Sequence, residues 1–175
     1  AGVWNRTAAK ARALAAELNC AVAASAADLA RDCEALVTCV SADQDLLALI
    51  AVVAPQLRAG ALLIDCSTVG ADTARAAAAQ LGARGVDFLD APVSGGPLGA
   101  KTRKLALLVG GDKAVFDKFK PALDAIGDQV IYIGPIGAGS VAKLVQHGRL
   151  RDADRACGSL HDGSQGGRRT ACAVG

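Results

Sequence analysis

Short apolar runs alternate with longer amphipathic segments through residues 1–147. The runs predict strands over residues 2–5, 35–40, 61–66, 86–89, 105–109 and 129–133. The segments between them predict helices over residues 8–18, around Leu29, from Asp43 to a stop near Pro55, over 71–81, from Asp112 and from Gly139. This alternation is typical of an α/β fold with a mostly parallel sheet.

Polar residues and apolar spacing add detail to these helices. We expect Thr7 to cap the first predicted helix, which would bury Leu14 and Leu18 together with an alanine. Ser25 is expected to cap the second helix in the same way. Pro121 predicts the first residue of a separate helical turn, because proline is tolerated there and lacks a backbone donor.

The pattern ends after His147. Residues 148–175 are rich in glycine and arginine and follow neither a helical nor a strand period. Such a segment buries too little apolar surface to offset the entropy of ordering it, so we expect residues 148–175 to form a disordered tail. We also consider the hypothesis that a frameshift in the gene produced this tail.

Composition narrows the class of protein. The chain has 175 residues, is 52% hydrophobic and carries a formal net charge of +2, as expected for one globular domain. Its longest apolar run, residues 46–54, is too short to span a membrane, and no basic stripe points to nucleic acid. Six cysteines without a C-x-x-C motif and two histidines favour reduced thiols in the cytoplasm over disulfides or a metal site.

A glycine-rich segment near the end of the pattern has two interpretations. Residues 137–142 fit the G-x-G-x-x-A form of a dinucleotide-binding loop. However, three residues separate the preceding strand from Gly137, and no suitable acidic residue follows before the tail. The alternative is that these glycines turn the chain into a helix, with the phosphate loop missing upstream of Ala1.

Four motifs in order resemble the β-hydroxyacid dehydrogenase family, which includes 3-hydroxyisobutyrate dehydrogenase. They are Asp65-Cys66-Ser67-Thr68, the run Asp90 to Gly96, Val109-Gly110-Gly111-Asp112, and Gly137-Ala138-Gly139 with Lys143. The resemblance implies a Rossmann-like, doubly wound sheet lacking its first strand and glycine loop. It also implies an incomplete NAD(P)-binding domain over residues 1–138, the start of an interdomain helix over 139–147, and homo-oligomers among full-length relatives.

The resemblance assigns cofactor contacts to three turns. They comprise Asn5, Arg6 and Thr7, then Val40 and Ser41, and finally Ser67 and Thr68. Without the resemblance, Ser67 and Thr68 would be turn or cap residues and Arg6 a surface arginine. An acidic residue in place of Arg6 would bind the free ribose hydroxyl of NAD, whereas a guanidinium suits a 2′-phosphate, so NADP is favoured over NAD.

The family's substrate site matches two further places. Ser94, Gly95 and Gly96 would bind the substrate carboxylate, and Lys143 would exchange a proton with its hydroxyl group. Asp90 is interpreted as structural, bonding nearby backbone groups. The chain departs from the family at Arg103, where a glycine is usual, and at His147, where an asparagine is usual.

These residues predict hydride transfer between a nicotinamide cofactor and a small 3-hydroxy acid or its semialdehyde, with no turnover by this chain alone. Ser67, Ser94 and Lys143 are expected to converge at the carboxyl edge of the sheet. The alternatives are a non-catalytic remnant that binds a nucleotide or a partner protein, and a different Rossmann enzyme with its phosphate loop at residues 137–142.

Overall fold

The computed structural model describes residues 1–31 and 33–159, and the side chains through Gly148. A first compact unit spans Ala1–Leu144, and a second begins at Val145. The first unit holds every residue predicted to form the site.

Within the described residues, the strands form two separate sheets. The smaller one pairs β1 (Gly2–Val3) in parallel with β2 (Ala21–Val22). The larger one has the order β3-β4-β5-β7-β6, with β8 also paired to β7. Its strands are β3 (Ala35–Thr38), β4 (Leu62–Asp65), β5 (Asp87–Asp90), β6 (Val93–Ser94), β7 (Ala106–Gly111) and β8 (Gln129–Gly134).

Strands β3, β4 and β5 run parallel, as do β7 and β8, but β7 runs antiparallel to both β5 and β6. The helices between the strands are α1 (Ala8–Leu18), α2 (Ala26–Arg31), α3 (Asp43–Val53), α4 (Ala71–Gly82), α5 (Gly96–Thr102), α6 (Lys113–Ile126) and α7 (Ala138–Ser159).

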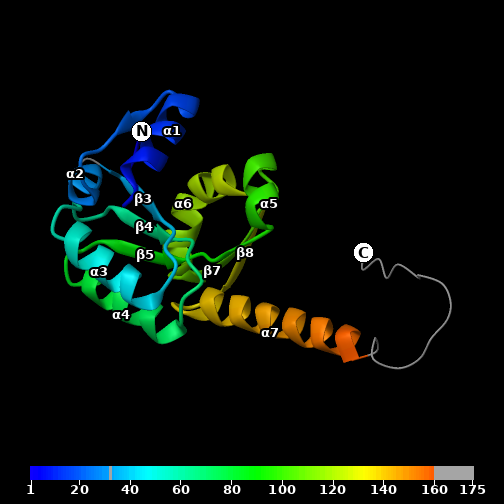
Figure 1. Ribbon diagram of the computed structural model, residues 1–175. Helices are drawn as coiled ribbons and strands as arrows, with labels where there is room; N and C mark the ends of the chain where they lie inside the picture. The colour runs from blue at the N-terminus through cyan, green and yellow to red at the C-terminus, as the bar shows by residue number, and fades with distance from the viewer. Residues whose placement is uncertain (32, 160–175) are drawn as a thin grey trace. The chain divides into compact units, whose positions relative to one another are not determined.

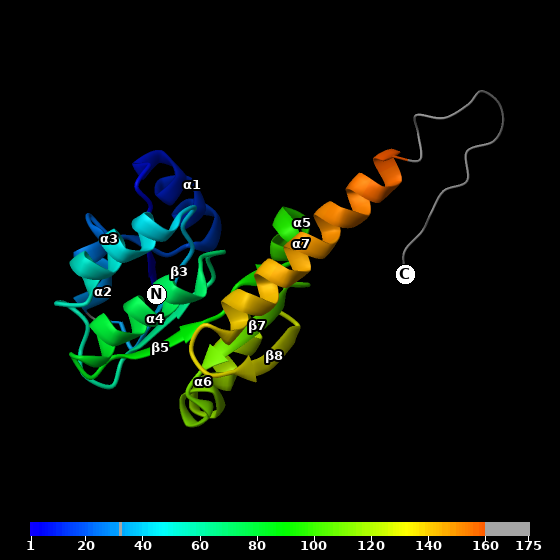
Figure 2. The same ribbon diagram turned by 90° about the horizontal axis from the view of Figure 1, so that it is seen from below.

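Helices cover both faces of the larger sheet. Because successive residues of a strand point to opposite sides, neighbouring residues of one strand belong to two different cores. Leu63 of β4 and Phe88 of β5 pack in one core with α3 and α4. Their sequence neighbours Leu62 and Leu89 pack in a second core with α6. Figures 1 and 2 show α3 and α4 together on one side of β4 and β5. The predicted α/β fold class is confirmed, with two antiparallel pairings of β7, to β5 and to β6, in an otherwise parallel sheet.

Most predicted helices begin and end close to the expected residues, but two of the three predicted local details differ. The Ser25 hydroxyl caps α2 as predicted, accepting the Asp28 amide at 3.1 Å. The Thr7 side chain makes no cap hydrogen bond, and the Thr7 amide instead donates to Asn5 at 2.8 Å. Pro121 lies inside a continuous α6 and starts no separate turn.

The buried face of α1 also differs from the prediction. Ala11 and Ala15 are buried, whereas Leu14 and Leu18 are 43% and 62% exposed. Helix α1 contacts the two-residue strands β1 and β2, which are too short to cover its whole length. Small side chains therefore make the close contact, and the leucines remain outside it.

The predicted start of the irregular tail needs correction. Helix α7 continues past His147 to Ser159, so the chain is still helical where we predicted disorder from residue 148. This stretch contains no proline, and its alanine, leucine and arginine residues favour a helix. The remainder of the predicted tail, residues 160–175, lies outside the described residues.

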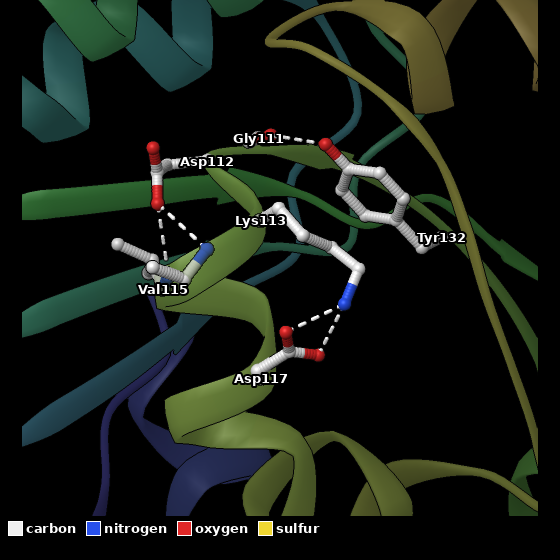
Figure 3. A network of polar contacts seen from close by, with 7 residues as sticks. Gly111, Asp112, Lys113, Val115, Asp117 and Tyr132 are labelled. Carbon is white, nitrogen blue, oxygen red and sulfur yellow. Dashed lines mark hydrogen bonds and ion pairs between the residues drawn. The ribbon is translucent and has the colours of Figure 1, made fainter.

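The turn between β7 and α6 is held by a local polar network (Figure 3). The Asp112 carboxylate accepts the amides of Ala114 and Val115 at 2.8 and 3.0 Å. The Tyr132 hydroxyl of β8 donates to the Gly111 carbonyl at 3.1 Å. Lys113 pairs with Asp117 one turn along α6, and its ammonium group also lies over the Tyr132 ring. These contacts fix where α6 begins.

Within the part of the chain that the structure describes, none of the helices combines the length and the apolar character needed to cross a membrane.

Candidate cofactor and substrate site

A cavity of about 600 Å³ gathers most of the predicted cofactor residues. Its lining includes Asn5, Arg6 and Thr7 from the turn after β1, and Val40 and Ser41 from the turn after β3. Residues of α1, α2, β3 and α3 also line it. Two turns that are distant in the sequence therefore share one concave surface, as cofactor binding would require.

Arg6 lines this cavity and is largely exposed to solvent. Its guanidinium lies 3.6 Å from the Asp45 carboxylate, and its side chain is 85% exposed. An exposed ion pair at this separation contributes little to stability. The guanidinium therefore remains accessible to an anionic ligand.

Ser67 does not line the cavity but is connected to it. The Val40 amide donates to the Ser67 hydroxyl at 2.8 Å, and that hydroxyl donates to Asp65 at 2.7 Å. Ser67 is buried, whereas Thr68 beside it is exposed. The turn after β4 thus touches the turn after β3 through one serine.

Asp65 is buried among these groups. Its carboxylate also accepts the Thr38 hydroxyl at 2.7 Å, and only 1% of the residue is exposed. Burial raises the pKa of Asp65, and the charge of Asp90 acts in the same direction, while the hydroxyl hydrogen bonds oppose them. Asp65 belongs to one of the family motifs, but no role was predicted for it from the sequence. An acidic residue ending an apolar strand was the available signal.

Asp90 binds the start of α7. One carboxylate oxygen accepts the Gly137 amide at 2.8 Å, and the other accepts the Ser140 amide at 2.9 Å. The predicted structural role of Asp90 is thereby borne out, although its partners are distant in sequence. These amides are not available to a phosphate, so residues 137–142 open a helix and do not form a dinucleotide loop.

Gly139 brings this helix unusually close to the sheet. A Cβ atom built at Gly139 would lie 2.1 Å from the Leu108 carbonyl oxygen, so only glycine fits there. Lys143, one turn later, is only 6% exposed. Burial lowers the pKa of its ammonium group below the usual value for lysine. A lysine with a lowered pKa can accept a proton more often at neutral pH.

The predicted substrate turn lies between β6 and α5. Ser94 pairs with Ala106 of β7, while Gly95 and Gly96 have φ angles of 128° and 60°. These left-handed angles favour glycine. The cavity lining does not include this turn or Lys143, and the convergence of Ser67, Ser94 and Lys143 stays a prediction. Arg103 has a φ angle of 58°, a conformation suited to the glycine usual in the family.

A sheet covered by helices on both faces places the chain among Rossmann-type α/β domains. Comparison with known proteins then identifies the family. Residues 2–134 match the family described as the NAD binding domain of 6-phosphogluconate dehydrogenase, and the chain belongs to it. Its relatives include 3-hydroxyisobutyrate dehydrogenase-like hydroxyacid dehydrogenases, which confirms the resemblance seen in the sequence.

Three similar proteins illustrate this relationship. A 3-hydroxyisobutyrate dehydrogenase from Pseudomonas aeruginosa is 46% identical over 83 residues, covering 47% of this chain and 28% of the relative. Glyoxylate/succinic semialdehyde reductase 1 from Arabidopsis thaliana is 33% identical over 146 residues, covering 82% of this chain and 50% of the relative. The structure of Mycobacterium tuberculosis 3-hydroxyisobutyrate dehydrogenase with L-serine has a TM-score of 0.80 at 31% identity, covering 84% of this chain and 50% of that one. The chain spans about half the length of the curated relatives that it matches over the longest stretches.

Proposed function

We propose that this chain is the nucleotide-binding part of an NAD(P)-dependent 3-hydroxyacid dehydrogenase. The observation that carries the proposal is the cavity shared by the turn at Asn5, Arg6 and Thr7 and the turn at Val40 and Ser41. The bound cofactor would accept hydride from the substrate carbon, or return it in the reductive direction. The substrate would be a small 3-hydroxy acid or the corresponding semialdehyde, as the names of the relatives suggest.

The proposed cofactor is NADP in preference to NAD. Arg6 offers an exposed planar cation that can form two parallel hydrogen bonds to a phosphate. The carboxylate of Asp45, with which Arg6 forms an ion pair, lies 3.6 Å away and can be replaced by a ligand phosphate at little cost. The carboxylate that would hold a free 2′-hydroxyl group is replaced here by this guanidinium.

The proposed chemistry uses two further places in the same compact unit. Lys143 would take the substrate hydroxyl proton during oxidation and return it during reduction, a role assisted by the lowered pKa of its buried ammonium group. Ser94 would donate its hydroxyl hydrogen to the substrate carboxylate, and the open backbone at Gly95 and Gly96 would offer amide donors.

Titration of the 175-residue chain with NADPH and NADH tests the cofactor assignment. Arg6→Ala should weaken NADPH binding by about 1–3 kcal/mol, the range for charge-assisted hydrogen bonds, and leave NADH binding nearly unchanged. Arg12→Ala is the matched control, because Arg12 is an exposed arginine outside the cavity lining. Equal losses for both cofactors would refute the preference for NADP.

A turnover assay separates the dehydrogenase from the alternative, a non-catalytic nucleotide- or partner-binding remnant. The chain covers about half the length of the relatives that it matches over the longest stretches. Hydride transfer is therefore expected only from a protein that also contains the part of those relatives that this chain does not cover. In such a protein, NADPH oxidation with small semialdehydes should be saturable and should be lost in Lys143→Ala. Nucleotide binding without turnover for every semialdehyde tested would favour the remnant.

A further inference from the structure

Asp65 lies where the turn after β3, which lines the cofactor cavity, is connected to the turn after β4. It is the last residue of β4, and its Oδ1 atom accepts hydrogen bonds from both the Thr38 and the Ser67 hydroxyl groups at 2.7 Å. The Ser67 hydroxyl in turn accepts the Val40 amide at 2.8 Å. One carboxylate oxygen therefore fixes the serine that holds the Val40 backbone.

These contacts form a relay from the sheet interior to the cavity wall. Val40 lines the cavity, while Ser67 and Asp65 lie behind it, each 1% exposed. A serine hydroxyl can rotate, and its lone pairs face the Val40 amide only when its hydrogen points elsewhere. Asp65 accepts that hydrogen, so the Ser67 hydroxyl is held as an acceptor for Val40.

We propose that Asp65 is a positioning residue of the cofactor site, acting through Ser67 to hold the Val40 backbone in the shape that the cofactor requires. This inference rests on the proposed cofactor function of the cavity. It extends that function to a residue that is not itself part of the cavity lining, although the lining residue Thr38 donates a hydrogen bond to it.

The electrostatic surroundings favour this role over a purely stabilising one. Asp65 is in register with Asp90 on the adjacent parallel strand, so two buried carboxylates lie side by side. Within the described part of the chain, the Asp65 Oδ2 atom has no hydrogen-bond partner. Cys39 and Cys66 are further titratable neighbours, and neither supplies a positive charge. A buried carboxylate in such a place adds little net stability.

Two variants separate the charge of Asp65 from its hydrogen-bond acceptor. Asp65→Asn keeps an oxygen that can accept from Ser67 and removes the negative charge beside Asp90. Asp65→Ala removes the acceptor entirely. Ser67→Ala is a milder change that breaks the same relay without altering a charge. Asp112→Ala is the control for general loss of stability, because that carboxylate caps α6 and contacts neither turn.

The relay itself is measured by hydrogen exchange of the Val40 amide, followed by NMR on the full 175-residue chain. We expect exchange at Val40 to be about tenfold faster or more in Asp65→Ala and Ser67→Ala, because the amide loses its ordered acceptor. Asp65→Asn and Asp112→Ala should retain the wild-type exchange rate at Val40. Unchanged Val40 exchange in Ser67→Ala would overturn the relay, even if Asp65→Ala failed to fold.

The consequence for binding is measured by NADPH titration of the same proteins. We expect about tenfold weaker binding in Asp65→Ala, with binding by Asp65→Asn restored to within about threefold of wild type. Faster Val40 exchange with unchanged NADPH affinity would overturn the positioning role and leave Asp65 purely structural. Failure of the wild-type chain to bind NADPH or NADH would instead overturn the proposed function, and with it this extension.

Discussion

The carboxylates of Asp112 and Asp90 both cap a helix, but one is exposed and the other is buried. Each carboxylate accepts two backbone amides at the start of a helix, Asp112 for α6 and Asp90 for α7. Asp112 is exposed and binds amides two and three residues ahead. Asp90 is 1% exposed and binds amides 47 and 50 residues ahead.

The difference shows what each cap determines. The Asp112 cap sets where one helix begins, and loss of the cap leaves its amides within reach of water. The Asp90 cap joins the end of β5 to the helix that carries Lys143, and its amides have no solvent to replace the carboxylate. A buried, long-range cap therefore determines the relative position of two parts of the proposed site.

Truncation of Asp90 should have the largest effect. Asp90→Ala leaves the buried amides of Gly137 and Ser140 without acceptors, and we expect a loss of about 2–4 kcal/mol in the free energy of unfolding. Urea denaturation followed by circular dichroism measures this loss. A cost below that of the equivalent change at Asp112 would contradict the distinction between the two caps.

The second-largest effect is expected in the pH dependence of the free energy of unfolding, to which the buried carboxylates contribute. Burial raises the pKa of Asp90 despite the two amide hydrogen bonds, and it also raises the pKa of Asp65. A raised pKa means that the folded chain binds the proton more tightly than the unfolded chain. The associated stability is present below the usual carboxyl pKa and declines as the pH rises through the folded value.

The measurement is the unfolding free energy of wild type minus that of Asp90→Asn, followed from about pH 3 to pH 8. We expect this difference to fall as the pH rises. Asp43 provides a control of opposite sign, because hydrogen bonds from Thr73 and Gly70 lower its pKa. The stability that Asp43 contributes should decline as the pH falls, and equal slopes for the two residues would contradict the assignment.

The local cap should show the smallest effect. Asp112→Ala is expected to cost about 1 kcal/mol, as for other exposed helix caps, and Asp112→Ser should recover most of it. Thermal unfolding of the three proteins tests this expectation. NADPH binding should be unchanged, since the turn at Asp112 lies outside the cavity lining. A change in affinity would show that the β7–α6 turn is coupled to the site.

Elements that depend on nearby residues could be predicted from the sequence. The predicted cap at Ser25 acts within three residues, and the helix predicted from Asp112 follows the apolar period of its own segment. Local prediction still failed at Thr7 and Pro121, whereas the buried face of α1 depended on partners elsewhere in the chain. Leu14 and Leu18 have a suitable spacing for burial, but the strands opposite them are too short to cover them.

The same distinction applies to the candidate site, where motifs indicated single residues but not their distant contacts. Family motifs indicated Arg6, Val40 and Lys143, and Asp90 was expected to bond nearby backbone groups. The actual partners of Asp90 come from the start of α7. The register of β4 with β5 places Asp65 beside Asp90. Periodicity along one strand carries no information about strand pairing, so this buried pair could not be derived from the sequence.

The separation of the two sheets has a consequence for cooperativity. Arg6 follows a strand hydrogen-bonded only within the β1–β2 pair, whereas Val40 follows a strand of the larger sheet. No shared ladder of backbone hydrogen bonds among the described residues holds the two walls of the cavity together. The segment from β1 to β2 can therefore open as its own cooperative unit, at a lower free energy than global unfolding. A nucleotide that touches both walls would suppress that opening, so slower amide exchange across α1 would accompany binding.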